Sequence, residues 1–186
     1  MNPNTDLLSI GVLLPHAKLY GGVKRFLELG NQFVELGHSV TIYTPTGEKP
    51  TWFSFKGDFS PISELNTKPL DALFFTEISF LLNVVNSTAS RKIYYIVNPS
   101  VNLKKLKQHR EIEFFANSNN LLLRAKKKFG IEAFPALGGV NLKNFSVKPM
   151  FTTLFCTSPY LPANKQKIRG LIYIYKTLLI PISRPL

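Results

Sequence analysis

The chain has 186 residues, of which 45% are hydrophobic, and a formal net charge of +12. This length and apolar content predict one globular domain with a hydrophobic core and exclude wholesale disorder. The single cysteine, Cys156, excludes an internal disulfide, no cysteine or histidine spacing suits zinc, and no apolar run is long enough to span a bilayer. We therefore expect a cytoplasmic protein without a bound metal.

The charge is unevenly distributed along the chain. Residues 146–186 hold six of the 23 basic residues and none of the 11 acidic ones, together with five prolines and no clean hydrophobic period. The composition therefore changes at about residue 146. We expect an α/β domain at 1–145 and an irregular, divergent basic tail at 146–186, of the kind that a frameshift or a poorly ordered segment produces.

The first part of the chain predicts a β-α-β unit. Residues 7–15 form a continuous apolar run, which is typical of a parallel strand buried on both faces. Residues 23–34 place apolar side chains at helical spacing, and Gly37 follows as the expected C-cap. Residues 39–44 are β-branched and aromatic, so they predict the second strand.

The alternation continues to about residue 140. Strands are predicted at 70–76, 92–98, 112–118 and 133–140, with helices between them at 77–87, 101–109 and 119–130. The segment before them is rich in Pro, Gly, Ser and Thr and predicts a long loop over 45–69, with room for a short strand that the pattern does not place. Strands alternating with helices predict a Rossmann-like open parallel sheet with helices on both faces.

The loop after the first strand holds the candidate site, because ligands of open α/β sheets bind beyond the carboxyl ends of the strands. Gly21 and Gly22 open the next helix, whose free N–H groups favour an anion. Without a Cβ, these glycines let a phosphate or a sugar approach the backbone closely. A tight turn without a ligand explains the pair as well. The spacing fits neither a P-loop nor a dinucleotide fingerprint.

Three segments resemble the N-terminal half of a family 4 (group 1) glycosyltransferase with the GT-B fold. They are GGVKRFLELGNQFVELGHSVTIYTP (21–45), FFANSNNLLLRAKKKFGI (114–131) and ALGGVNLKNF (136–145). The resemblance implies two Rossmann-like domains across a cleft, the first holding the acceptor and the second the nucleotide-sugar, with retaining transfer and no metal. It implies that Gly21 and Gly22 lie near the donor, with Lys24 just inside the helix that follows.

The chain departs from that family in two respects. Only 41 residues follow Phe145, and they contain no acid for the Glu-x7-Glu pattern of the second domain. Asn98 stands near the end of the fourth predicted strand, where many members have a histidine, and an amide cannot exchange protons near neutral pH. The resemblance therefore implies a truncated glycosyltransferase homologue that is inactive alone.

The candidate acceptor-binding residues are His16, Tyr20 and Asn98, which follow the predicted strands at the carboxyl edge. His38 sits at a helix-to-strand turn and is interpreted as structural, whereas His109 lies in a basic segment at the surface. The expected ligands are a nucleotide-sugar donor and a sugar or lipid-linked acceptor, with no tightly bound cofactor. No catalytic residue is assigned.

A second hypothesis is a freestanding α/β binding module that docks on a membrane surface or on a partner that supplies the donor domain. The basic segments 104–110 and 124–128 suit anionic lipid head groups, although a solvated face with compensation of the helix dipole is the favoured explanation. No nucleic-acid-binding motif accompanies the charge, so we expect no nucleic-acid partner. A nucleotide-dependent oxidoreductase is disfavoured because the dinucleotide fingerprint fails.

Overall fold

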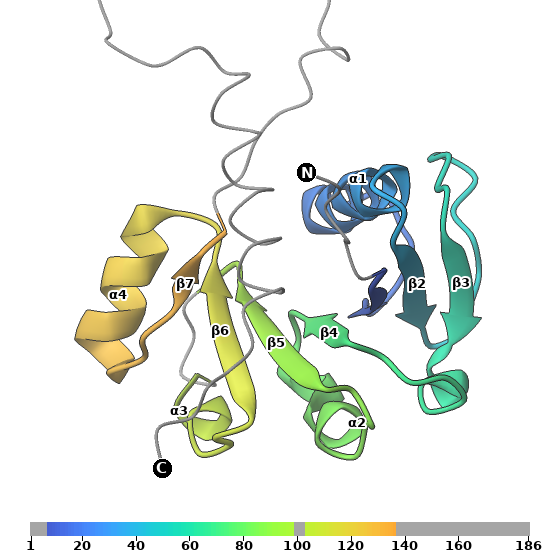
Figure 1. Ribbon diagram of the computed structural model, residues 1–186. Coiled ribbons are helices and arrows are strands. Elements are labelled where there is room, and N and C mark those ends of the chain that lie inside the picture. The colour runs from blue at the N-terminus through green and yellow to red at the C-terminus, as the bar shows by residue number, and fades with distance from the viewer. Residues whose placement is uncertain (1–6, 99–102, 137–186) are drawn as a thin grey trace, which may run out of the picture.

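The computed structural model describes residues 7–98 and 103–136, which form a single parallel sheet of seven strands in the order β3-β2-β1-β4-β5-β6-β7 (Figure 1). The strands are β1 (Ser9–Leu13), β2 (Ser39–Thr44), β3 (Asp58–Pro61), β4 (Ala72–Phe75), β5 (Arg91–Ile96), β6 (Ile112–Ala116) and β7 (Phe134–Pro135). The predicted Rossmann-like open sheet is confirmed.

The order of the strands reverses beside β1, which pairs with β2 on one side and β4 on the other. Val12, for example, lies opposite Ile42 on β2 and Phe74 on β4, and all three side chains are buried. Such continuous apolar strands are typical of a parallel sheet covered on both faces. In this architecture the reversal point opens a crevice at the carboxyl ends of the strands, where ligands bind.

Helices cover both faces of the sheet, as predicted (Figure 1). Helix α1 (Gly21–Glu35) packs on one face, and α2 (Leu81–Val85), α3 (Leu103–Leu106) and α4 (Asn119–Phe129) pack on the other. The division follows from chain direction. After β1 the chain moves toward β2 and β3, whereas after β4 it moves the opposite way, and right-handed crossovers then place the helices on opposite faces.

The predicted ends of the two long helices agree with the structure. The Ser118 side chain caps α4 by accepting a hydrogen bond of 3.3 Å from the Leu121 N–H, and Gly130 ends this helix in the left-handed region at φ 61°. Gly37 follows α1 at φ 95°, a conformation that suits glycine. These local signals fix where the chain turns from helix back to strand.

The long loop predicted at 45–69 contains the edge strand β3, which the sequence pattern did not place. This strand is short and half exposed, and it pairs only with β2 through Thr41 opposite Asp58 and its neighbours. The preceding loop packs against α1, where Phe55 fills the space beside Gly30 so tightly that an added Cβ would lie 2.7 Å from its ring. A glycine in α1 thus permits this close contact.

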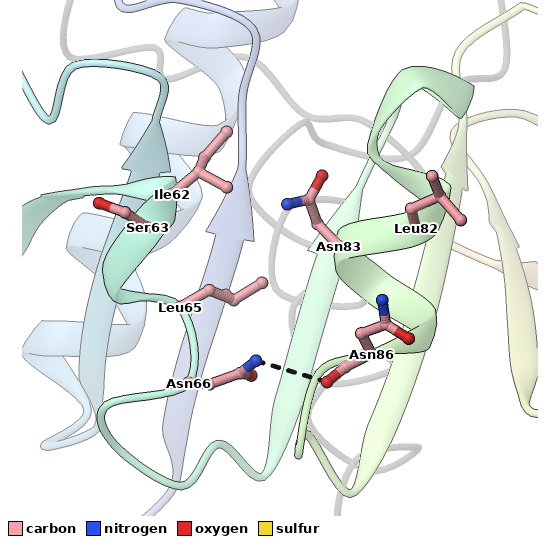
Figure 2. A pocket seen from close by; sticks show the side chains of 7 residues that line it. All are labelled: Ile62, Ser63, Leu65, Asn66, Leu82, Asn83 and Asn86. Carbon is pink, nitrogen blue, oxygen red and sulfur yellow. Dashed lines mark hydrogen bonds between the residues drawn. The ribbon is translucent and has the colours of Figure 1, made fainter.

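The helix predicted at 77–87 is shorter than expected. It consists of one 3₁₀ turn, η2 (Ile78–Phe80), followed by five residues of α2. A second 3₁₀ turn, η1 (Ile62–Glu64), follows β3, and a hollow lies between η1 and α2 (Figure 2). The hollow is formed by segments that are about twenty residues apart in the sequence.

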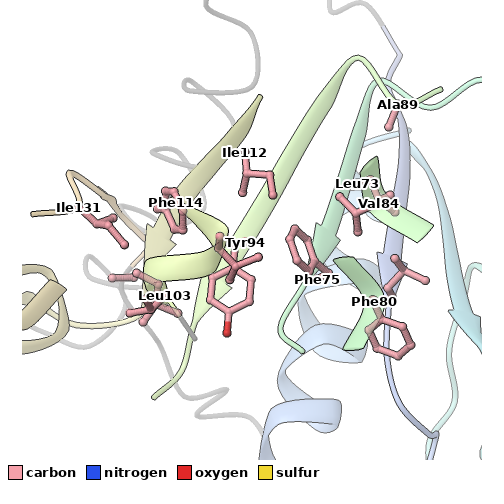
Figure 3. Close-up of a cluster of buried hydrophobic side chains, with 14 of the residues drawn as sticks. Leu73, Phe75, Phe80, Val84, Ala89, Tyr94, Leu103, Ile112, Phe114 and Ile131 are labelled. Atoms are coloured by element: carbon pink, nitrogen blue, oxygen red, sulfur yellow. The ribbon is translucent and has the colours of Figure 1, made fainter. Parts of the chain in front are cut away.

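Two layers of buried apolar side chains hold the sheet. The layer on the side of α2, α3 and α4 includes Phe75 and Tyr94 from the strands and Phe80, Val84 and Leu103 from the connections (Figure 3). The layer on the side of α1 joins its buried face to the alternate residues of the same strands. Because each strand contributes to both layers, the central strands contain little but apolar residues.

The remaining predictions on the C-terminal part lie outside the described residues. These are the strand residues after 136, the boundary at about residue 146 and the basic tail at 146–186.

Candidate functional site

The candidate site is built on the loop that leads from β1 into α1. Gly21 and Gly22 are the first two residues of α1, preceded by Tyr20 as an extended N-cap at φ −132° and ψ 148°. The Tyr20 side chain makes no capping hydrogen bond. The first N–H groups of the helix therefore have no intrahelical acceptor and no cap from this side chain.

Neither glycine is required by the fold itself. Neither has a positive φ angle, and apart from the adjoining backbone a Cβ added to Gly21 or Gly22 would meet no atom of residues 7–98 and 103–136 within 4 Å. Glycine is less favourable than alanine by up to about 1 kcal/mol inside a helix, and these are the first two helical positions. Within the described residues, neither backbone conformation nor packing therefore calls for a glycine at either position.

No acidic side chain in the first turn neutralises the positive end of the α1 dipole. Instead, Lys24 and Arg25 follow the glycines after one buried residue, Val23. Cations at a helix N-terminus oppose the macrodipole, which carries roughly half a positive charge there. The site therefore concentrates positive potential and can bind an anion.

The two basic residues differ in what they contact. Lys24 is exposed, whereas Arg25 is partly buried and turns toward the sheet. The Arg25 Nε donates a hydrogen bond of 2.8 Å to the Tyr95 hydroxyl, and its Nη2 donates one of 3.2 Å to the Ala136 carbonyl. The Tyr95 hydroxyl also donates to this carbonyl at 3.1 Å. We call these three residues the Arg25 cluster.

The Arg25 cluster joins α1, β5 and the end of β7. Tyr95 is only 1% exposed, and burial raises the pKa of its hydroxyl, an effect that the nearby Arg25 charge opposes. The guanidinium carbon lies 5.4 Å from the centre of the Tyr95 ring, within range of a cation–π contact. Sequence analysis missed Tyr95, although a tyrosine in a buried strand usually needs a partner for its hydroxyl.

His16 and Tyr20 lie together in the loop before α1. Their ring centres are 4.9 Å apart at an interplanar angle of 37°, and Tyr20 is 60% exposed. The His16 Nδ1 is buried and makes no hydrogen bond within the described part of the chain. The structure therefore brings together two of the three predicted acceptor-binding residues.

The third predicted residue, Asn98, lies just beyond β5 and is exposed. It follows β5 at the same edge of the sheet at which the loop after β1 lies, because all the strands are parallel. The described residues give it no contact with His16 or with the glycine pair.

The long loop before β3 also reaches the candidate site. The Trp52 indole Nε1 donates a hydrogen bond of 2.8 Å to the carbonyl of Ala17, one residue after His16. Trp52 packs edge-on against Phe53 and contributes to the apolar layer beside α1. Both aromatic residues lie in the loop predicted at 45–69, and sequence analysis assigned them no further role because nothing local indicates the partner of the indole.

The other histidines lie away from the site. His38 is 3% exposed, its Nδ1 accepts a hydrogen bond of 3.2 Å from the Leu8 N–H, and burial lowers its pKa. This position agrees with the structural role expected for it. His109 is partly buried, with Nδ1 3.5 Å from a Glu111 carboxylate oxygen.

Residues 7–98 and 103–136 contain neither a metal-binding cluster nor a membrane-spanning helix. No group of three or more His, Cys, Asp or Glu side chains in these segments is arranged to hold a metal ion. Every helix there is too short or too polar to cross a bilayer.

Basic side chains also gather on α3 and α4. Lys104, Lys105, Arg124 and Lys127 are exposed, and Leu123 lies among them with 70% of its surface in water. Lys126 pairs at 3.2 Å with Glu132, which partly neutralises this face.

Comparison with solved structures supports the fold. The crystal structure of a glycosyltransferase from Rickettsia africae ESF-5 is similar, with a TM-score of 0.53 and 16% sequence identity over 97% of this chain. The match covers 52% of that glycosyltransferase, so the chain spans about half its length. No protein-family model matches the sequence, and no curated protein matches it significantly. The likeness shows a glycosyltransferase-like α/β fold.

Proposed function

We propose that the chain is the acceptor-side half of a GT-B glycosyltransferase of family 4. In this role it places an acceptor opposite a nucleotide-sugar that a second domain holds, and transfer retains the anomeric configuration. The observation that carries the proposal is the glycine pair, which no backbone conformation or packing within the described residues requires and which lies at a positively charged helix end. The fold shared with a glycosyltransferase of about twice the length supports it.

The proposed role of Gly21 and Gly22 is to admit the donor's phosphates to the free N–H groups of α1. Backbone N–H groups at a helix N-terminus bind phosphate well, and the absence of a Cβ brings the two into contact. Lys24, which is exposed in the first turn, supplies a positive charge beside them. His16 and Tyr20 line the acceptor side, with Asn98 at the same edge of the sheet.

No residue of the chain is assigned as a general base. In this arrangement the second domain makes most of the contacts with the nucleotide-sugar, so we expect weak donor binding at the N-terminus of α1 and no transfer by these 186 residues alone. The reaction requires no resident metal or cofactor under this proposal. We place it in the cytoplasm, where nucleotide-sugars are available.

The test separates binding from stability. The Gly22→Ala variant adds a Cβ that meets no atom of the described residues outside the adjoining backbone, so it raises the stability of α1 by less than the value of about 1 kcal/mol typical of a helix interior. The same Cβ keeps a phosphate away from the backbone and lowers nucleotide-sugar affinity about tenfold, equal to the loss of one hydrogen bond to a charged group. Affinity is measured on the full ¹⁵N-labelled chain by chemical-shift titration with several nucleotide-sugars.

A charge-matched pair provides the control. Lys24→Gln and Lys127→Gln remove one exposed positive charge each, at α1 and at α4. Only the first variant weakens nucleotide-sugar binding. Equal losses in both variants, shifts that avoid residues 20–25, or turnover by the isolated chain in a sugar-transfer assay would each contradict the proposal.

A second candidate function is docking on a membrane surface. The observation that favours it is Leu123, an exposed apolar side chain among the basic residues of α4. A basic face with apolar side chains suits an anionic bilayer surface. Co-sedimentation of the full chain with anionic vesicles, but not with zwitterionic ones, tests it. Leu123→Ser reduces this binding, and Leu36→Ser, at the exposed end of α1, serves as the matched control.

A further inference from the structure

The hollow between η1 and α2 is a second candidate site, on the face of the sheet opposite α1. Its volume is about 270 Å³, large enough for a small ring-shaped ligand and near the lower end of ligand pockets. Figure 2 shows side chains from η1 on one wall and from α2 on the other. It shares no residue with the glycine-pair site, so the two are separate.

Hydrogen bonds across the base of the hollow tie its two walls together. The Asn66 Nδ2 donates at 3.4 Å to the carbonyl of Asn86, and the Asn66 Oδ1 accepts at 3.3 Å from the N–H of Thr88. Leu65 is buried beside them in the apolar core. The base is therefore held in place without a ligand, which reduces the loss of conformational freedom on binding.

The walls offer polar groups without charge. Asn83 lies on α2 and Asn86 directly follows this helix, and both line one wall of the hollow, whereas the Ser63 hydroxyl on η1 points away from them (Figure 2). Each carboxamide both donates and accepts hydrogen bonds. No acidic or basic side chain lines the hollow. A phosphate or a carboxylate would find no cation here, whereas a ligand with neutral hydroxyl groups finds a partner for each.

The rim adds an apolar surface. Leu82 also lines the hollow and is 76% exposed, the largest exposed fraction among the large hydrophobic side chains of the described residues. A sugar ring has both kinds of surface that this site complements, with hydroxyl groups at its edge and C–H groups on its faces. Burial of those C–H groups against leucine removes apolar surface from water and is therefore favourable.

We propose that the hollow binds a neutral saccharide unit through Asn83 and Asn86. This inference rests on the proposed function, because it assigns the saccharide to the acceptor and so makes the acceptor a neutral glycan. The glycine-pair site takes the anionic donor, and the amide-lined hollow takes an uncharged sugar of the acceptor. The two sites differ in charge as their ligands do.

The test uses the full ¹⁵N-labelled chain and a panel of soluble saccharides. Cellobiose, maltotriose and N,N′-diacetylchitobiose are the neutral probes, with glucuronic acid and glucose 6-phosphate as charged ones. We expect neutral probes to shift the side-chain amide signals of Asn83 and Asn86 saturably, and charged probes to shift them at least about tenfold more weakly. The double variant Asn83→Ala/Asn86→Ala loses about tenfold or more in affinity, a cost typical of two hydrogen bonds.

The matched control is Asn120→Ala, which removes the same group from an exposed position on α4. It leaves saccharide binding unchanged, and thermal unfolding confirms that all variants remain folded. If the double variant unfolds, Asn83→Gln keeps the carboxamide but displaces it, and it also lowers affinity. Binding that survives the double variant, equal loss in Asn120→Ala, equal binding of charged probes, or no shift by any saccharide overturns the inference.

The same sample distinguishes this failure from failure of the proposed function. Nucleotide-sugars report on residues 20–25, and neutral saccharides report on Asn83 and Asn86. Shifts at 20–25 without shifts in the hollow leave the donor site supported and refute the saccharide site. Saccharide shifts in the hollow without any at 20–25 support saccharide binding and refute the assignment of that saccharide to an acceptor.

Discussion

Removal of the Tyr95 hydroxyl should destabilise the chain through the Arg25 cluster. In Tyr95→Phe the ring remains, and with it the edge-on contact with Phe26 at 5.3 Å and the cation–π contact with Arg25 at 5.4 Å. Only the two hydrogen bonds of the hydroxyl are lost, one from Arg25 and one to Ala136. The variant therefore isolates the polar part of the cluster.

The structure limits the size of the effect. The Ala136 carbonyl keeps the hydrogen bond from the Arg25 Nη2, so it is not left without a donor. Arg25 is only partly buried, and its Nε can reach water when the hydroxyl is gone. We therefore expect a loss of about 1 to 1.5 kcal/mol in the free energy of unfolding, typical of one net hydrogen bond and below the cost of breaking a fully buried charge pair.

Urea unfolding measures this loss, with far-UV circular dichroism and tryptophan fluorescence as probes. Trp52 is the only tryptophan, so fluorescence reports on one place next to the loop before α1. Arg25→Met completes a double-mutant cycle with Tyr95→Phe, and the expected coupling energy is about 1 kcal/mol. Tyr20→Phe is the matched control, because it removes the same hydroxyl from an exposed residue.

Two results would refute this reasoning. One is a Tyr95→Phe variant as stable as the original chain. That result would mean that the hydrogen bonds of the hydroxyl in the folded chain are no more favourable than its hydrogen bonds to water in the unfolded chain. The other is a coupling energy near zero, which would mean that Arg25 and Tyr95 act independently despite their 2.8 Å hydrogen bond.

Three further predictions concern pH and packing. Burial raises the pKa of Tyr94 to about 12, so stability is full below pH 10 and falls by roughly 3 kcal/mol as pH rises through 12. Tyr94→Phe removes this loss in urea unfolding at each pH. Burial lowers the pKa of His38, so stability falls as pH drops below 6.5, and His38→Asn, which keeps an acceptor but does not titrate, unfolds with a shallower acid dependence. Gly57→Ala forces its Cβ against the carbonyl oxygen of Val40 and lowers stability in thermal unfolding by about 1 to 3 kcal/mol. Gly22→Ala makes no such contact with the described residues and does not lower stability. Equal stability of the two variants would contradict the close packing around Gly57.

Local signals predicted most of the fold. The strands β1, β2, β5 and β6 are buried on both faces, so their sequences are apolar runs that need no knowledge of neighbours. The edge strand β3 has the sequence DFSP and pairs on one side only, so neither burial nor β-branched residues mark it. The length of α2 was overestimated, because an apolar stretch without Gly or Pro does not show where a 3₁₀ turn gives way to an α-helix or where that helix ends.

The candidate site was only partly predictable, because its contacts join distant residues. The glycine pair and its place after β1 follow from a local pattern and the general rule for α/β sheets. The hydrogen bond from Arg25 to Tyr95 spans 70 residues, and that from Trp52 to Ala17 spans 35. The amide-lined hollow joins η1 to α2 in the same way. No single segment carries such a signal.

Two adjacent residues near the start of α1 have different proposed roles, Arg25 in stability and Lys24 in binding. The Arg25 Nε and Nη2 donate hydrogen bonds to Tyr95 and Ala136, so replacement of Arg25 should change stability more than it changes binding. Lys24 is exposed near two glycines that no packing within the described residues requires, so its replacement should change anion binding and leave stability within about 0.5 kcal/mol. A helix that only covered the sheet would need neither the glycines nor the cation next to them. The opposite effects of Gly22→Ala on stability and on binding therefore test whether this end of α1 evolved for a ligand.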